Sequence, residues 1–268
     1  MNIIDEIKQL NKNEYEEFIS RRIYCLKKEE KHNSKDIGIN KLGIMKISGY
    51  QSATSDFLDS QKISIENGLG DVVLCTIGNI NEVYIDIVNE ISKNNCDESD
   101  VFKYIFKVVN NYFGDFSNIT ERMKYYPNED MVDLGEKQGE ISQLKGKNAG
   151  MCVERAVLSH NIMKFLGINS TLKFSGIMND NKLEAHTYNL VNINDSYYIY
   201  DSTIPRLDNN NINPIITEIP KEAYELQKDG HMNNGYSIET SYYSPLSNRT
   251  RHIIYDCNRE NEKEKIVK

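Results

Sequence analysis

The sequence predicts an α+β fold in which helices come first and an antiparallel sheet follows. Apolar residues recur at helical spacing in 101–113 and again in 152–166. Three runs rich in β-branched and aromatic residues then follow one another, separated by short polar stretches: 170–178, 184–193 and 196–201. Because helical and strand segments are grouped and do not alternate, the pattern favours α+β over a parallel α/β sheet.

The first 95 residues are expected to form helices and short strands. Residues 2–31 have the apolar spacing of one or two amphipathic helices, interrupted by a polar NKN stretch. Residues 37–50 and 71–78 have the composition of short strands, and 80–93 favours a helix. We expect this region to pack on the rest of the chain, with an unknown role.

The segment before Cys152 is loop-rich. The helix over 101–113 is expected to be capped by Ser99 or Asp100 and ended by Gly114. The following stretch, 115–149, holds one proline and several glycines. Long irregular segments inside a compact domain are often functional.

The C-terminal part predicts fewer elements. Gly167 should end the helix over 152–166. A short helix around 221–230 and a last strand over 251–257 follow an asparagine-rich loop. The charged tail, 258–268, is expected to be frayed. The expected organisation is an N-terminal region (1–95), a catalytic domain (96–257) and this tail.

Composition excludes several functional classes. The chain is 39% hydrophobic and 27% charged, as in ordinary soluble domains, and its net charge of -8 argues against a dedicated nucleic-acid binder. No apolar run approaches the roughly 20 residues of a membrane helix, and the N-terminus does not look like a signal peptide. We therefore expect a cytoplasmic protein without membrane partners, although a mature secreted form is also compatible.

The five cysteines are odd in number, scattered, and without a CxxC pair, so neither a zinc ribbon nor a dithiol redox motif is present. Free thiols are expected, and no metal or cofactor. Cys25, Cys75 and Cys257 are expected to be buried as small hydrophobic residues. Cys96 lies in a polar run and is expected at the surface.

Cys152 has the setting of a nucleophile. It follows Gly150 and Met151 at the predicted start of a helix. A thiol with the ordinary pKa of about 8.5 is mostly protonated at neutral pH. A helix N-terminus favours the thiolate, and its N–H groups can donate hydrogen bonds to an oxyanion. Gly150 would let the substrate approach the backbone closely.

His186 and Asp201 have the settings of a base and the group that orients it. If Asn194 and Asp195 form a two-residue turn, Ile193 pairs with the residue after the turn, and Asp201 lies diagonal to His186 on the same face. A one-residue shift of the turn would make His186 and Asp201 direct partners, whereas an odd loop or a bulge would separate them. An orienting carboxylate fixes the imidazole tautomer and stabilises the imidazolium.

Each residue also has a plain structural interpretation. Cys152 alone could be a core thiol at a helix start, His186 a satisfied or surface histidine, and Asp201 a cap at the end of a strand. The three settings together favour catalysis, because each residue has the surroundings that its role needs.

The stretch GMCVERAVLSHNIMKFLGINSTLKFSG, followed by EAHTYNLVNINDSYYIYDST, resembles the core of the transglutaminase-like superfamily. There, Gly-x-Cys begins an Ala/Leu-rich helix that ends in Leu-Gly-Ile. A strand with His and then an aromatic residue follows, and then a strand that ends in Asp-x-Thr. The likeness covers about residues 100–205. The aromatic after the histidine, usually Trp, is Tyr188 here, and the chain has no Trp.

The resemblance implies a papain-like core with a nucleophile helix packed on an antiparallel sheet. It implies Cys152 as nucleophile, His186 as base and Asp201 as orienter in a protease, amidase, deamidase or transamidating acyltransferase acting on a peptide or protein. The amide carbonyl would form a thioester that water or an amine releases. No D-x-[DN]-x-[DN]-G loop occurs, which argues against calcium gating. Gln143 and Asn148 are candidate oxyanion donors, or ordinary loop amides.

Other interpretations stay open. One is acyl transfer from a coenzyme A thioester; another is a noncatalytic binding or scaffold protein with this fold; a third places the function in residues 1–95. Among other polar residues, His160 is expected to be structural, and His231 and His252 have no partner pattern. Glu154 and Arg155 are expected to be charges of the helix surface or of its first turn, and Glu154 also suits the helix N-terminus.

Overall fold

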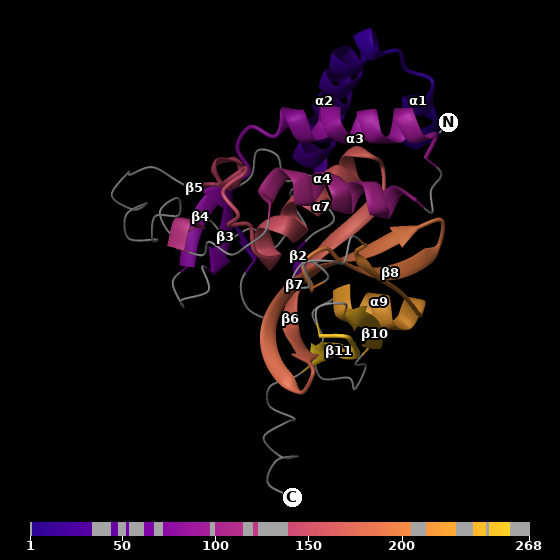
Figure 1. The fold of residues 1–268 in the computed structure, drawn as a ribbon. Coiled ribbons are helices and arrows are strands. Elements are labelled where there is room, and N and C mark those ends of the chain that lie inside the picture. The colour runs from indigo at the N-terminus through magenta and orange to yellow at the C-terminus, as the bar shows by residue number, and fades with distance from the viewer. Residues whose placement is uncertain are drawn as a thin grey trace, which may run out of the picture.

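The structure is a computed structural model of the 268-residue chain. It describes residues 2–33, 44–47, 52–53, 62–66, 72–96, 100–114, 120–122, 139–204, 213–228, 238–244 and 247–257. The described chain is mixed α+β, with helices stacked at one side of a larger, nearly closed antiparallel sheet and a smaller sheet beside them (Figure 1). This confirms the α+β class.

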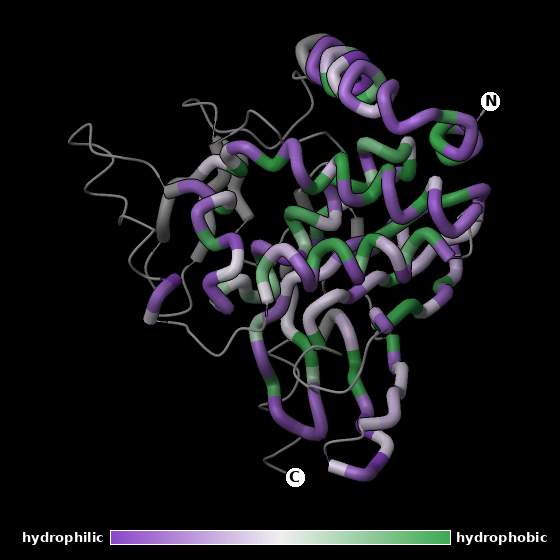
Figure 2. Tube along the Cα trace, turned by 45° about the horizontal axis from the view of Figure 1, so that its top comes forward, coloured by the Kyte–Doolittle hydropathy of each residue, from purple (hydrophilic) through white to green (hydrophobic). Residues whose placement is uncertain are grey.

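The helices of the N-terminal half gather around α7 (Cys152–Phe165), the helix that begins at Cys152. They are α1 (Ile3–Lys8), the 3-10 turn η1 (Lys12–Glu14), α2 (Tyr15–Asn33), α3 (Asn81–Asn94) and α4 (Val101–Phe113). Helix α2 is mostly hydrophilic (Figure 2) and buries only a narrow face. Helix α7, in contrast, is buried on nearly every side. It is therefore the central helix of the layer.

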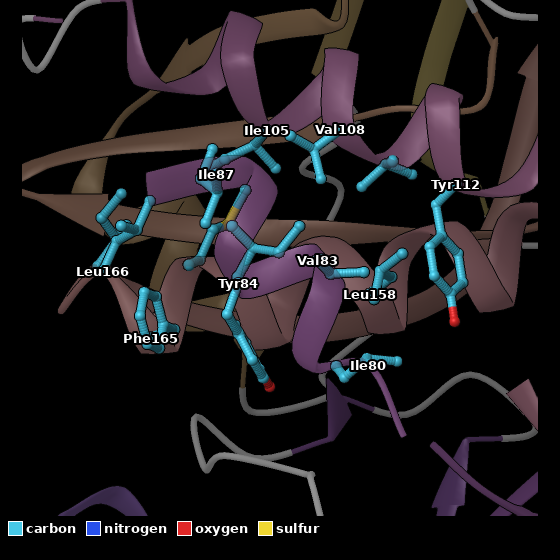
Figure 3. Close-up of a cluster of buried hydrophobic side chains, with 14 of the residues drawn as sticks. Ile80, Val83, Tyr84, Ile87, Ile105, Val108, Tyr112, Leu158, Phe165 and Leu166 are labelled. Carbon is cyan, nitrogen blue, oxygen red and sulfur yellow. The ribbon is translucent and has the colours of Figure 1, made fainter. Parts of the chain in front are cut away.

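One hydrophobic core joins these helices (Figure 3). The ring of Phe165 at the end of α7 stacks on Tyr84 of α3, with ring centroids 4.7 Å apart. The same ring meets Phe18 of α2 edge-on at 6.0 Å. Ile105 of α4 and Leu158 of α7 belong to the same core. The first helices of the chain thus share their core with α7.

The larger sheet carries the strands after α7. Its order is β10 (Ile238–Ser244), β11 (Arg249–Cys257), β6 (Asn169–Asn179), β7 (Lys182–Ile193), β8 (Ser196–Asp201) and β9 (Ile215–Ile219), and β2 (Ser52–Ala53) also pairs with β6. Its two outer strands approach each other, since the Thr217 hydroxyl of β9 donates to the Thr240 hydroxyl of β10 at 3.0 Å. Helix α9 (Lys221–Lys228) lies beside this sheet (Figure 1).

A second core fills the inside of this curved sheet. It contains Tyr188 and Leu190 of β7, Ile199 of β8, Tyr224 of α9 and Tyr255 of β11. The sheet therefore separates two apolar layers, one against α7 and one against α9.

The turn between β7 and β8 is the predicted two-residue turn. Asn194 and Asp195 have φ values of 49° and 60°, the left-handed conformation that a type I′ turn requires. Ile193 pairs with Ser196, and the register continues to the pair Asn189–Tyr200. This register fixes which side chains of the two strands share a face.

The smaller sheet is mixed. Its order is β1 (Ile44–Ile47), β3 (Lys62–Glu66), β4 (Val72–Thr76) and β5 (Gly139–Glu140), followed in the chain by the 3-10 turn η2 (Ile141–Leu144). The pairs β1–β3 and β4–β5 are parallel, and β3–β4 is antiparallel. Strand β5 leads through η2 toward Cys152.

The predicted helices over 80–93, 101–113 and 152–166 are confirmed, as are the three strands that follow them. Strands β2, β3, β5, β9 and β10 were not predicted. Strand β9 is only five residues long, and β10, IETSYYS, has mixed polar and aromatic composition. Such strands are specified by their neighbours in the sheet more than by their own sequences.

Two predictions for cysteines are wrong. Cys25 is exposed, because it lies beside the exposed Tyr24 on the outer face of α2. Cys96 is buried, because Asn95 ends α3 in a left-handed conformation (φ 46°) and turns the chain back, so that the Cys96 N–H donates to the Ile91 carbonyl. The side chains of Cys75 and Cys257 lie outside what the structure describes.

Among the described residues, no helix is both long enough and apolar enough to cross a membrane.

A buried ion pair holds the beginning of α7. Arg122 donates from Nε to Oε1 of Glu154 at 2.7 Å and from Nη2 to the same atom at 2.5 Å. Both side chains are essentially inaccessible to solvent. Glu154 lies in the first turn of α7, as predicted, but the surface alternative is wrong: the surrounding helices cover this turn and leave Arg122 as its counter-charge.

We expect Glu154→Gln to destabilise the fold by about 3 to 5 kcal/mol, because it leaves the buried Arg122 charge uncompensated. Glutamine keeps an acceptor oxygen of similar shape, so the substitution isolates the charge. The matched control is Glu82→Gln, which removes the half-exposed Glu82–Lys145 pair and should cost less than about 1 kcal/mol. Urea unfolding of both variants measures the difference, and equal losses would contradict the prediction.

Candidate active site

Cys152 is the first residue of α7, as predicted. Met151, the residue before it, is extended (φ -89°, ψ -167°), so the helix begins sharply at the cysteine. The Met151 N–H donates to Oε2 of Glu154 at 2.8 Å, which satisfies one donor at the helix start. Cys152 is half-buried, whereas the residues that follow it in the first turn are buried. Its thiol therefore lies at the boundary between core and solvent.

Arg155 fixes the chain segment that leads to Cys152. Its Nε donates to the Gly150 carbonyl at 2.8 Å, and its Nη1 donates to Oδ1 of Asn110 at 2.7 Å. Its Nη2 donates to the carbonyl of Gly114, at the end of α4. Arg155 lies in the first turn, as one alternative of the prediction had it, but it is fully buried, so the surface alternative is wrong. Polar groups of the α4 end and the Gly150 carbonyl satisfy its donors, which makes this burial possible.

The close approach of this segment to α4 requires glycine at position 150. A Cβ atom there would lie 2.5 Å from a ring carbon of Phe113, far inside van der Waals contact. The Asn148 N–H also donates to the Phe113 carbonyl at 3.1 Å. The segment before Cys152 is thus held against the end of α4 by shape and by hydrogen bonds.

His186 and Asp201 come together across the β7–β8 hairpin. Extending the register from the pair Asn189–Tyr200 places Asp201 diagonal to His186, as the predicted turn implied. Nε2 of His186 lies 2.7 Å from Oδ2 of Asp201. Both side chains are almost completely buried. The structure therefore joins this pair in the predicted geometry.

Four hydrogen bonds converge on the Asp201 carboxylate. Oδ2 accepts from His186 and from the hydroxyl of Tyr255, the latter at 2.8 Å. Oδ1 accepts from the N–H groups of Thr203 at 2.8 Å and Ile204 at 3.2 Å. A carboxylate has about four acceptor positions, so this one is saturated. Its orientation is fixed by groups from two strands and from the loop after β8.

Cys152 meets the same histidine. The thiol contributes to raising the pKa of His186, as a hydrogen-bonding and as a charged neighbour of the ring. Because Nε2 faces Asp201, Nδ1 is the ring nitrogen left for the thiol. The structure therefore brings Cys152, His186 and Asp201 into one chain of contacts, from a helix start and two neighbouring strands.

Electrostatics favour a charged pair. Burial by itself lowers the pKa of His186, but the Asp201 charge, the hydrogen bond to Asp201 and the contact with Cys152 raise it to about 10. Burial raises the pKa of Asp201, but the His186 charge and its hydrogen bonds to His186, Thr203 and Tyr255 hold it below its ordinary value. At neutral pH the pair is thus imidazolium and carboxylate.

The inner side of this pair is aromatic. The ring of Tyr188 lies roughly parallel to that of His186, with centroids 6.4 Å apart, and meets Tyr255 at 4.8 Å. Tyr188 is buried, and its hydroxyl donates to Oε1 of Gln227 on α9 at 3.0 Å. The buried Lys173 donates to the Gln227 carbonyl at 2.7 Å. Helix α9 thus contacts the residues behind His186 at the inner face of the curved sheet.

The proposed oxyanion donors lie apart from this chain of contacts. Gln143 is exposed on η2, and Asn148 is exposed at the turn that follows. The Asn148 side chain lies against Gly114, where a Cβ atom would be 2.0 Å from its Oδ1. Within the described part of the chain, no hydrogen bond joins either side chain to Cys152. Their role stays a prediction.

The remaining histidines have other surroundings. His160 is buried on α7, and its Nδ1 lies 3.0 Å from the Ser170 hydroxyl, consistent with a structural role. His252 is exposed, with its Nδ1 3.6 Å from Glu239. His231 and the side chain of His32 lie outside what the structure describes.

Sequence reasoning missed Tyr255 and Arg155 as parts of the site. Tyr255 lies 54 residues after Asp201, on a strand whose neighbour in the sheet is β6. No local spacing links it to the carboxylate. Arg155 lies three positions after Cys152. A charged residue in the first turn of an otherwise apolar helix is the sequence signal that could have identified it.

In the described part of the chain, no group of three or more histidine, cysteine or acidic side chains could hold a metal ion. Comparison of the chain with family models, with curated proteins and with solved structures finds no match. The site is therefore interpreted from its own geometry.

We expect His186 to remain an imidazolium well above pH 7 in a Cys152→Ser background, because the Asp201 charge stays in place. Adding Asp201→Asn should lower the pKa of His186 below its ordinary value of about 6.5, because burial alone then disfavours the cation. Nitrogen-15 NMR of the histidine side chains across pH measures both, with the other histidines as internal references. An unchanged titration after Asp201→Asn would contradict the assigned ion pair.

Proposed function

We propose that this chain is a transglutaminase-like cysteine enzyme with a papain-like catalytic core. It attacks an amide carbonyl of a peptide or protein and forms a thioester. The observation that carries the proposal is the contact of a thiol at a helix start with a buried histidine that is itself held by a saturated carboxylate. A nucleophile, its base and an orienting group in mutual contact are the requirement for thiol catalysis.

The first step would be acylation. Because His186 is an imidazolium, it already holds the thiol proton, and the Cys152 thiolate attacks the carbonyl carbon, so that a C–S bond forms and the carbonyl oxygen becomes an oxyanion. His186 then gives its proton to the departing nitrogen, the C–N bond breaks, and an amine or ammonia leaves. A thioester remains on Cys152. Asp201 keeps its charge throughout and stabilises the imidazolium.

The second step would release the acyl group. Water or a primary amine gives a proton to His186 and attacks the thioester carbon. The C–S bond breaks, and the Cys152 thiolate leaves beside the protonated His186, which restores the starting ion pair. With water the net reaction is hydrolysis or deamidation, and with an amine it is transamidation.

The start of α7 supplies the expected stabilisation of the oxyanion. The first N–H groups of a helix have no carbonyl partner within the helix. Glu154 already occupies the N–H of Met151, which leaves the N–H of Cys152 as the donor beside the reacting carbon. The hydrogen bond from Arg155 to the Gly150 carbonyl and the close packing of Gly150 on the Phe113 ring would hold this donor in place during the reaction.

The thiol is the first point to test. We expect iodoacetamide to label Cys152 well below about pH 8, because the imidazolium and the helix start stabilise a thiolate. His186→Ala should abolish this early labelling. Cys25 is the matched control within the same chain, since it is exposed and no histidine contact with it is found among the described side chains. Peptide mass spectrometry after labelling across pH assigns each site; a Cys25 that reacts first, with Cys152 inert, would contradict the proposal.

The reaction itself is the second test. We expect the wild type to release ammonia or new amino termini from a mixed peptide library, and Cys152→Ala to lose this activity by at least about a thousandfold. Adding a fluorescent primary amine separates the two outcomes, because only transamidation incorporates the amine into a peptide. Circular dichroism of Cys152→Ala should match the wild type. A variant with undiminished release would remove Cys152 as the nucleophile.

A further inference from the structure

We propose that Tyr255 is a positioning residue of the site, which holds the Asp201 carboxylate ionised and oriented toward His186. This inference rests on the proposed function for its catalytic meaning, although the contact itself can be tested without any substrate.

The contact is direct and buried. The Tyr255 hydroxyl donates to Oδ2 of Asp201 at 2.8 Å, the same oxygen that faces Nε2 of His186. Tyr255 is fully inaccessible to solvent, and Asp201 nearly so. Water therefore does not replace this hydrogen bond if it is lost. A hydrogen bond to a buried charged group is among the stronger ones in proteins.

The backbone of β11 is irregular at this position. Ile254 pairs with Met178 of β6 and Cys257 pairs with Gly176, so one extra residue lies on β11 between the two pairs. Such a bulge redirects the side chains beside it and is frequent near active sites. Tyr255 lies within this bulge. The local distortion of β11 is thus located where the strand supplies a donor to Asp201.

Packing leaves the Tyr255 ring little freedom. It meets Tyr188 at 4.8 Å in an edge-to-face arrangement, and Tyr188 in turn lies against His186. Both tyrosines belong to the core inside the curved sheet. The hydroxyl therefore approaches Oδ2 of Asp201 from a fixed direction. The N–H groups of Thr203 and Ile204 donate to the other oxygen, Oδ1.

The consequence is chemical. Removing the hydroxyl takes away one of four hydrogen bonds that stabilise the negative charge of Asp201, so the carboxylate is protonated more easily. Once it is protonated, His186 loses the counter-charge that keeps it an imidazolium. During acidification, the His186–Asp201 ion pair is therefore lost at a higher pH than in the wild type.

The decisive variant is Tyr255→Phe in the full chain, which removes the hydroxyl and keeps the ring. We expect the acid limb of iodoacetamide labelling at Cys152 to move upward by about one pH unit, with little change near neutral pH. Tyr112→Phe is the control, because the Tyr112 hydroxyl is buried on α4 without a hydrogen-bond partner among the described residues. An unmoved limb in a folded Tyr255→Phe protein would overturn the inference.

A double variant separates positioning from general loosening. If Tyr255 acts through Asp201, Tyr255→Phe has no further effect on the labelling profile once Asp201→Asn is present. A shift of the same size in both backgrounds would overturn the inference, because the hydroxyl would then act elsewhere.

Carbon-13 NMR of the Asp201 carboxyl provides a measurement that does not depend on the thiol. In Tyr255→Phe its titration should move to higher pH even if Cys152 proves unreactive, a result that would end the proposed function and leave this inference standing. If Tyr255→Phe does not fold, tyrosine labelled at Cζ in the Asp201→Asn protein replaces it. The Tyr255 signal should then shift relative to wild type, and an unchanged signal would overturn the inference.

Discussion

The buried carboxylate of Asp201 is the constraint on which the site depends. A charge placed in a protein interior is costly unless hydrogen bonds and a counter-charge compensate it. Here the compensation comes from His186, from Tyr255 on β11 and from two N–H groups after β8. The sheet must curve until β11 and β8 supply groups to the same side chain. The near closure of the sheet and the ionisation of its central carboxylate are therefore linked.

A second buried charge organises the other half of the site. Arg155 donates to the carbonyls of Gly150 and Gly114 and to the Asn110 side chain. It thereby ties the start of α7 to the end of α4. The Glu154–Arg122 pair lies in the same first turn. The helix start that presents Cys152 is thus fixed by polar contacts, while the rest of α7 is fixed by apolar packing. Together these polar and apolar contacts fix the position of the Cys152 thiol and leave it half-buried.

Local sequence patterns were sufficient for the elements that carry the predicted site. Apolar spacing located α4 and α7, and the Asn194–Asp195 turn gave the register that makes His186 and Asp201 diagonal neighbours. Both depend on residues that are close in the chain. Burial of Glu154, Arg155 and Cys96 was not predictable in this way, because it depends on which helices cover each face. Strands β9 and β10 were missed for the same reason, since pairing in the sheet defines them.

The sequence by itself determined that a cysteine begins a helix and that a histidine and an aspartate share one face of a hairpin, because helix caps and two-residue turns are encoded by neighbouring residues. Only the tertiary structure decided that the helix start meets that hairpin, and that Tyr255 reaches Asp201 across the curved sheet. These contacts join residues far apart in the chain. Their existence depends on how two apolar layers pack on either side of one sheet, and no local pattern records that packing.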